Sequence, residues 1–123
     1  MNARNAYVTS SVQTASPTRL LIMLFERLAR DVEMAANAQE AGDHRSAMPH
    51  LLHAQEIVLE LMTSLRRDVW DGADRLASIY GWLHKELVRA NTTRDAAITR
   101  DCQRLVDPLV ATWREAALVA AAG

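Results

Sequence analysis

The chain has 123 residues, of which 50% are hydrophobic and 24% are charged, and its formal net charge is −1. This length fits one domain with its own core, and the near-neutral charge argues against a nucleic-acid surface, which usually carries a strong basic excess. The first 15 residues are polar and no run approaches the roughly 18 apolar residues of a membrane span, so we expect neither a secretory signal nor membrane insertion. The single cysteine, Cys102, excludes an internal disulfide and suits a reducing compartment. These features predict a cytosolic, soluble, mostly helical domain.

The first predicted helix runs from Ser16 to about Gly42. Ser16 can cap it, Pro17 suits the first helical position, and Gly42 suits the left-handed position after the last turn. Residues at 3.6 spacing then give one apolar face. This face contains Leu21, Leu24, Phe25, Leu28, Val32 and Ala35.

The second helix is expected to open with Ser46 as its cap. A proline is tolerated only within the first helical turn, and Ser46 places Pro49 there. The predicted apolar face contains Ala47, Leu51, Ala54, Val58, Leu61, Met62 and Leu65.

The third helix is predicted from about Asp71 to Asn91. Its apolar face contains Leu76, Ile79, Tyr80, Leu83, Leu87 and Ala90. The run 92–95, Thr-Thr-Arg-Asp, offers a partial capping box for a fourth helix. That helix carries Ile98, Cys102, Leu105, Val106, Leu109, Trp113 and Ala116 on its apolar face. Pro108 removes a hydrogen bond to Arg104 and is expected to kink or break it.

Short connections between helices of similar length favour antiparallel neighbours. The sequence therefore predicts an all-α fold, an antiparallel up-and-down four-helix bundle over residues 16–123, preceded by a polar leader over residues 1–15.

Several large apolar residues do not lie on these faces. They are Ile22, Met23, Met48, Leu52, Leu59, Trp82 and Val88. A single exposed leucine is common, but a contiguous apolar patch usually marks an interaction site. A helical bundle can offer such a patch to an amphipathic helix or an extended peptide.

No motif for catalysis or metal binding is present. His50 and His53 can share a helix face with Glu56, but no Cys pair and no Glu-x-x-His motif accompanies them, and surface histidines are the simpler interpretation. A phosphotransfer bundle would need Lys and Gly just after its histidine, and His84 lacks that pattern. Cys102 lies on a core face and is expected to be inert. We therefore expect no enzyme activity, no cofactor and no metal.

The order of several short motifs resembles the flagellin export chaperones (FliS) over nearly the whole chain. The matching residues are Ala6-Tyr7, Thr14-Ala15-Ser16-Pro17, Leu20-Leu21, Met23-Leu24-Phe25, Ala54-Gln55-Glu56-Ile57, Glu60-Leu61, Ser64-Leu65, Leu76, Ile79-Tyr80, Leu83, Leu87, Ala90-Asn91 and Trp113. The chain departs from the family pattern at Phe25 and Trp82, where tyrosine is common, and at His53, where lysine is frequent. Pro49 and Pro108 are also unexpected.

The resemblance implies a non-catalytic cytosolic chaperone. Such a protein binds the disordered C-terminal segment of flagellin in an apolar helical groove, prevents premature polymerisation and delivers flagellin to the flagellar type III export apparatus, whose export gate components are further partners. The family also implies that the leader covers part of the groove until the client arrives.

The residues expected to bind the partner are Tyr7, Ile22, Leu52, Leu59, Tyr80, Trp82 and Leu87, with Tyr7 as the removable cover. Tyr80 and Leu87 also lie on the core face of their helix. Two alternatives stay open, a generic helical adaptor without flagellin as client and a homodimer that buries the patch against a second copy.

Overall fold

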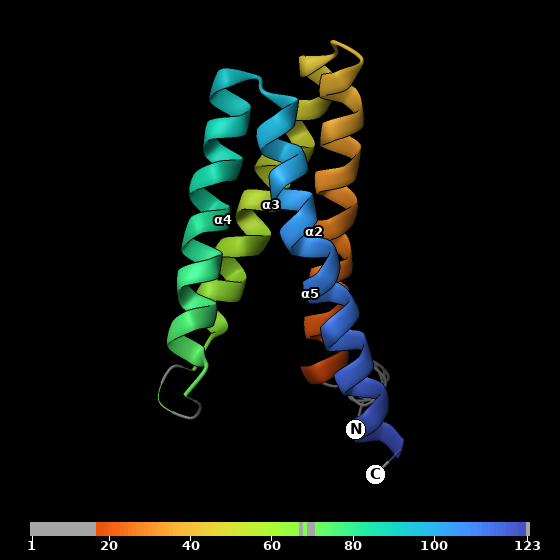
Figure 1. The fold of residues 1–123 in the computed structure, drawn as a ribbon, viewed down its shortest axis with the longest axis vertical. Coiled ribbons are helices and arrows are strands. Elements are labelled where there is room, and N and C mark those ends of the chain that lie inside the picture. Colours follow the sequence, from red (N-terminus) through yellow and green to blue (C-terminus); the bar gives the residue numbers. More distant parts are fainter. Residues whose placement is uncertain (1–16, 67, 69–70, 123) are drawn as a thin grey trace, which may run out of the picture.

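The computed structural model describes residues 17–66, 68 and 71–122, and these residues form a bundle of four helices (Figure 1). The helices are α2 (Pro17–Glu40), α3 (His44–Ser64), α4 (Ala73–Thr93) and α5 (Ala96–Ala122). No strand occurs in this part of the chain, so the predicted all-α four-helix fold is confirmed. The leader, including Tyr7, and the expected cap Ser16 lie outside the described residues.

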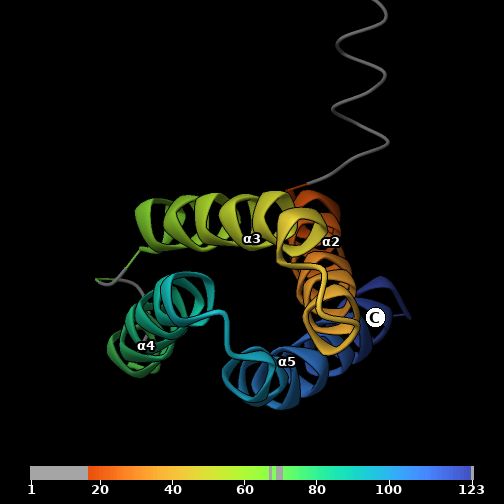
Figure 2. The same cartoon turned by 90° about the horizontal axis from the view of Figure 1, so that it is seen from above.

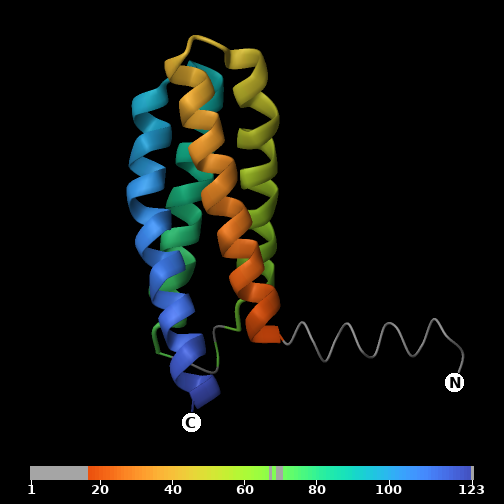
Figure 3. The same cartoon turned by 90° about the vertical axis from the view of Figure 1, so that its right-hand side faces the viewer.

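The four helices form a closed ring in chain order. Seen from above, α2 is followed by α3, α4 and α5, and α5 returns to α2 (Figure 2). Among the described residues, helices that face each other across the ring do not touch, and the α4–α5 packing is the least extensive. The side view shows that the four long axes run in the same overall direction (Figure 3). Successive helices are therefore antiparallel neighbours, as short connections predict.

The buried core follows the predicted apolar faces closely. Phe25 on α2 lies in the middle of this core, with its ring centroid 6.3 Å from that of Tyr80 on α4. Ile57 and Val110 are also buried, although neither was placed on a face, whereas Met62 and Ala116 are exposed. The differences arise because a helix at a bundle corner buries an arc wider than one row of residues.

The predicted start of α3 is wrong by three residues. Asp43, not Ser46, is the cap, because its carboxylate accepts hydrogen bonds from the Ser46 backbone N–H (3.1 Å) and the Ser46 hydroxyl (2.6 Å). These bonds hold the pKa of Asp43 below its ordinary value. Pro49 is consequently the sixth residue of the helix, beyond the first turn. The helix loses one backbone bond there, and its buried apolar face compensates.

The boundary between α4 and α5 also differs from the prediction. Helix α4 continues past Asn91 to Thr93 and ends at Arg94, which adopts a left-handed conformation with φ of 54°. Asp95 then caps α5, because its carboxylate accepts a hydrogen bond from the Ala97 N–H at 2.9 Å. The Thr92 hydroxyl instead donates back to the carbonyl of Arg89.

Helix α5 runs through Pro108 without a break, so the predicted interruption is wrong (Figure 1). Thr112 donates its hydroxyl proton to the carbonyl of Pro108 at 2.8 Å. Apolar residues on both sides of the proline, Val106 and Val110, are buried against the core. Their burial keeps the two halves of the helix together despite the missing backbone bond.

Polar contacts fasten the end of the bundle where α4 joins α5. Gln39 on α2 donates to the carbonyl of Ala90 (3.2 Å) and accepts from the hydroxyl of Thr99 (2.5 Å). Close by, Arg100 pairs with Glu40 at 2.6 Å, and this hydrogen-bonded partner lowers the pKa of Glu40. The contacts link α2 to both α4 and α5. No helix in the described ranges is both long and apolar enough to cross a membrane.

Candidate functional site

Helix α3 carries a second apolar row beside its buried one. Met48, Leu52, Leu59 and Met62 are all exposed, with exposed fractions of 44% for Leu52 and 47% for Leu59. Each of the four directly follows a buried residue, and Gln55 fills the remaining position of the row. The resulting spacing of four, three, four and three residues is the heptad pattern by which one helix packs against another.

This second row lies on the side of α3 that faces α4. The amide of Gln55 donates to the backbone carbonyl of Leu87 on α4 at 3.4 Å, which fixes the direction of the row. The opposite flank of α3 faces α2, because His50 and His53 contact Asp31 there.

Helix α4 has a matching row on the side that faces α3. Ala77, Gly81, His84 and Val88 directly follow the buried residues of α4 at the same spacing. Val88 is nine residues from Ile79, which faces α5, so it lies about 180° around the helix from Ile79. We call the two rows together the α3/α4 face. It consists of Met48, Leu52, Gln55, Leu59, Met62, Ala77, Gly81, His84 and Val88.

The structure separates the other predicted exposed residues from this face. Trp82 is 43% exposed but lies about 120° around α4 from Val88, on the flank shared with Ile79. Ile22 is partly buried and lies one turn before Glu26, which pairs with Arg114 of α5 at 3.3 Å. Leu52 and Leu59 therefore share a surface, whereas Trp82 and Ile22 belong to other sides of the bundle.

The remaining predicted binding residues do not lie on the described surface. Tyr80 and Leu87 are buried in the core, with exposed fractions of 2% and 0%. Burial raises the pKa of the Tyr80 hydroxyl to about 12. Because neither side chain can reach a partner on this surface, their contribution is to shape the core beneath it. Tyr7 lies outside the described residues, so its role as a cover stays a prediction.

A cleft of about 500 Å³ opens between α4 and α5. The two helices meet at the loop that joins them and diverge towards the other end of the bundle (Figure 1). The cleft is lined by Asp71, Gly72, Arg75, Leu76, Ile79, Leu109, Thr112 and Trp113. Sequence reasoning assigned Leu76, Ile79, Leu109 and Trp113 to the core, since residue spacing carries no information about how far two helices diverge.

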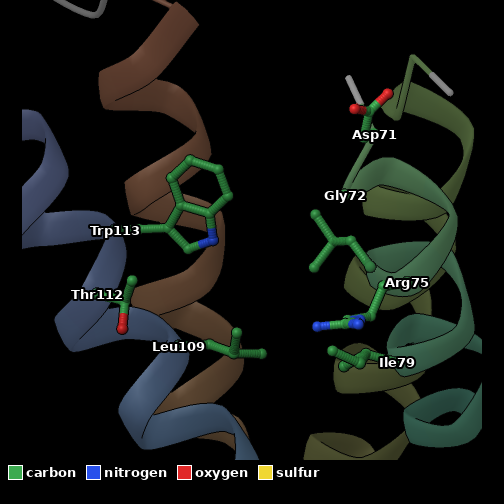
Figure 4. Close-up of a pocket in the computed structure, with 8 residues that line it drawn as sticks. Asp71, Gly72, Arg75, Ile79, Leu109, Thr112 and Trp113 are labelled. Atoms are coloured by element: carbon green, nitrogen blue, oxygen red, sulfur yellow. The ribbon is translucent and has the colours of Figure 1, made fainter. Parts of the chain in front are cut away.

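Aromatic and charged side chains shape the walls of this cleft. Trp113 stacks on buried Phe25, with ring centroids 5.9 Å apart and an interplanar angle of 21°. Leu109 and Trp113 face Ile79 across the opening, and the guanidinium of Arg75 points into it (Figure 4). The cleft therefore offers apolar walls together with a cationic group, a combination that suits a peptide side chain or a short helical turn.

A buried polar cluster between α2 and α3 was missed by the sequence analysis. Asp31 is 1% exposed, and its two carboxylate oxygens receive hydrogen bonds from Nδ1 of His50 (3.3 Å) and Nδ1 of His53. Arg27 adds a longer contact at 3.6 Å. The interpretation of these histidines as solvated surface residues is thus corrected. The available signal was the position of Asp31 directly before Val32 on the core face.

The described residues contain no cluster of three or more His, Cys, Asp or Glu side chains that could hold a metal ion. Cys102 is buried, as predicted, and burial together with nearby Glu86 and Asp101 raises the pKa of its thiol to about 12. At neutral pH the thiol is therefore protonated and a poor nucleophile.

Two known proteins or families resemble this chain. The family model described as flagellar protein FliS matches residues 1–120. The flagellar secretion chaperone FliS of Bacillus subtilis (strain 168) is 30% identical over 115 residues, which cover 94% of this chain and 86% of that relative. The similarity therefore extends across all four helices.

Proposed function

The chain belongs to the FliS family of flagellar secretion chaperones, which is not a family of enzymes, and we propose that its client is the C-terminal segment of flagellin. In this proposal the protein binds newly made flagellin in the cytosol, prevents premature polymerisation and delivers the subunit to the flagellar type III export apparatus. Export gate components are then the second class of partner.

One observation carries the proposal. Apolar surface is exposed at separate places around the bundle, namely the α3/α4 face, the cleft between α4 and α5, and Trp82 on α4 between them. A globular partner with one flat interface could cover only part of this surface. A disordered segment can wrap around the bundle and fold as it binds, so that it reaches all three places.

Binding by a wrapped segment also explains why these residues are tolerated on the surface. Large exposed apolar areas favour aggregation unless a partner covers them. The client would cover them on the chaperone and would in turn have its own apolar face covered, which prevents it from assembling with other flagellin subunits.

Calorimetry with a synthetic flagellin C-terminal peptide from the same organism tests the proposal. We expect a dissociation constant near or below about 1 μM and a clearly negative heat-capacity change, since coupled folding buries apolar surface. An unrelated amphipathic peptide of equal length and charge is the control. If the flagellin peptide gives no heat and no complex on a sizing column, the assignment of flagellin as client is wrong.

The homodimer alternative predicts a different result. A surface that is buried against a second copy would give a stable dimer without client. Light scattering during size-exclusion chromatography across a wide concentration range separates the two alternatives, because the chaperone proposal expects a monomer that forms a complex only when the peptide is added.

A further inference from the structure

The α3/α4 face has the construction of a helix-packing surface whose third helix is missing. On both α3 and α4, each residue of the face directly follows a core residue, so the two outer rows repeat the spacing of the two core rows. A residue that follows a core position points about 100° away from it. Because α3 and α4 are antiparallel, this rotation turns both outer rows towards the same outer side of the pair (Figure 2).

Gly81 is the least expected residue of this face. It stands in the middle of α4, where glycine is the poorest helix former after proline. A Cβ atom added at Gly81 would meet no atom within 4 Å, so nothing inside the chain requires a glycine there. A glycine that internal packing does not need marks a place where another backbone approaches closely.

The position of Gly81 along the face follows from a contact already described. Gln55 on α3 reaches the carbonyl of Leu87 on α4, and Gly81 precedes Leu87 by six residues. In an antiparallel pair, Gly81 is therefore level with the stretch of α3 between Leu59 and Met62. The missing side chain of Gly81 leaves room beside two exposed apolar side chains.

The edges of the face carry charges of opposite sign. Glu56 and Glu60 are exposed on the outer edge of α3, one turn apart and about 40° and 80° around from Leu52. Arg45 is on the same edge but nearer to the start of the helix. Lys85 is exposed on the outer edge of α4, about 60° around from Val88. The middle of the face is thus bordered by carboxylates on one side and an ammonium group on the other.

We propose that the α3/α4 face binds one amphipathic helix of the client, which crosses α4 at Gly81 and places basic residues along Glu56 and Glu60. The heptad spacing of the rows selects a helix with an apolar stripe. The edge charges determine the direction in which that helix lies, because the reverse direction would exchange its two edges. The inference rests on the proposed function only in taking the client as the source of this helix.

Designed peptides test the chemistry of this site independently of flagellin. One helical peptide carries leucines at heptad spacing with lysines along both edges, and a matched peptide carries glutamates in place of the lysines. With the full chain at low ionic strength, we expect the lysine peptide to bind about tenfold more tightly, since two acidic groups outweigh one Lys85. The double variant Glu56→Lys/Glu60→Lys should reverse this preference. The variant Glu33→Lys/Glu115→Lys, with the same net charge but substitutions at exposed sites on α2 and α5, should keep it.

Gly81→Ala tests the crossing point. We expect a higher unfolding temperature, by about 3–5 °C, because alanine favours the helix and fits the open space. The same variant should bind the lysine peptide about threefold to tenfold more weakly, since the added methyl group holds the peptide backbone away. Ser78→Ala, on the outer side of the same helix, is the control for helix propensity and should leave binding unchanged.

Three results would overturn the proposal. They are equal binding of the two peptides, a preference that Glu56→Lys/Glu60→Lys leaves unchanged, and a Gly81→Ala variant that is more stable but binds normally. A dimer of the free protein that Leu59→Asp dissociates would assign the face to a second copy instead. If flagellin fails to bind while the designed peptides behave as expected, only the proposed client is wrong. If flagellin binds and charge reversal changes neither ligand, only the proposed helix site is wrong.

Discussion

The indole of Trp113 stacks on the buried ring of Phe25 with 5.9 Å between their centroids, so one aromatic pair joins α5 to α2 and at the same time forms a wall of the α4–α5 cleft. Phe25 is fully buried, whereas Trp113 is only partly buried. The pair therefore connects the stability of the bundle with the shape of an exposed site.

Trp113→Ala is expected to lower the free energy of unfolding by about 2–3 kcal/mol, because it removes the stacked ring and part of the core contact. Urea unfolding followed by circular dichroism measures the change. Trp113→Phe should recover most of the loss. A loss below about 0.5 kcal/mol for Trp113→Ala would show that the stack does not support the bundle.

Trp82→Ala should behave in the opposite way. Trp82 is 43% exposed, so its removal should change the free energy of unfolding by less than about 0.5 kcal/mol. If the client covers it, the affinity for the flagellin peptide should fall by about 2 kcal/mol, or roughly thirtyfold, because aromatic residues dominate such interfaces. Calorimetry on the folded variant checks this, and unchanged affinity would remove Trp82 from the client site.

Asp31→Ala is expected to destabilise the bundle by about 2–4 kcal/mol, since it leaves two imidazoles without their buried acceptor. Arg27→Ala is the matched control. Arg27 approaches the same carboxylate at 3.6 Å from an exposed position, so its loss should cost less than about 1 kcal/mol. Similar unfolding curves for the two variants would contradict a structural role for the buried carboxylate.

Stability should fall at alkaline pH because of Cys102. Its thiol has an ordinary pKa of 9.0 and a folded pKa of about 12, raised mainly by burial. The unfolded chain therefore loses this proton first, and the stabilisation that is complete below pH 9 is lost as pH rises towards 12. Tyr80 adds a similar loss that begins near 10.0.

Thermal unfolding of Cys102→Ala under reducing conditions separates the two groups. The variant should show a flat stability between pH 9 and 10, where the parent protein already declines, and should decline only above pH 10. Parallel curves for the two proteins across this range would contradict the assignment to the thiol.

Pro108→Ala should stabilise the protein by about 1–2 kcal/mol, because alanine restores the backbone bond to Arg104 while the unfolded chain regains some freedom. Pro17→Ala is a suitable control, since Pro17 is the first residue of α2 and has no such bond to restore. Urea unfolding compares the two variants. A destabilised Pro108→Ala protein would mean that the proline shapes α5 in a way that packing needs.

The sequence alone determined the four helices and most of the core, because apolar spacing and turn residues act within a few positions of one another. Leu28, Leu51, Leu83 and Val106 were assigned to the core from spacing, and the structure buries all four. The helix starts were less certain, since Ser46 and Asp43 are both good caps and only the packing of α3 selects between them.

The tertiary structure decided how the exposed residues are grouped. Leu52 and Trp82 have similar exposure and looked equivalent in the sequence, yet the direction of each helix relative to its neighbours places them on different sides of the bundle. The cleft beside Trp113 and the burial of Asp31 between two helices likewise depend on contacts between segments far apart in the chain. Local spacing fixes which face of a helix is apolar, but the helix that covers it, and the gap that remains, are set only when all four helices pack together.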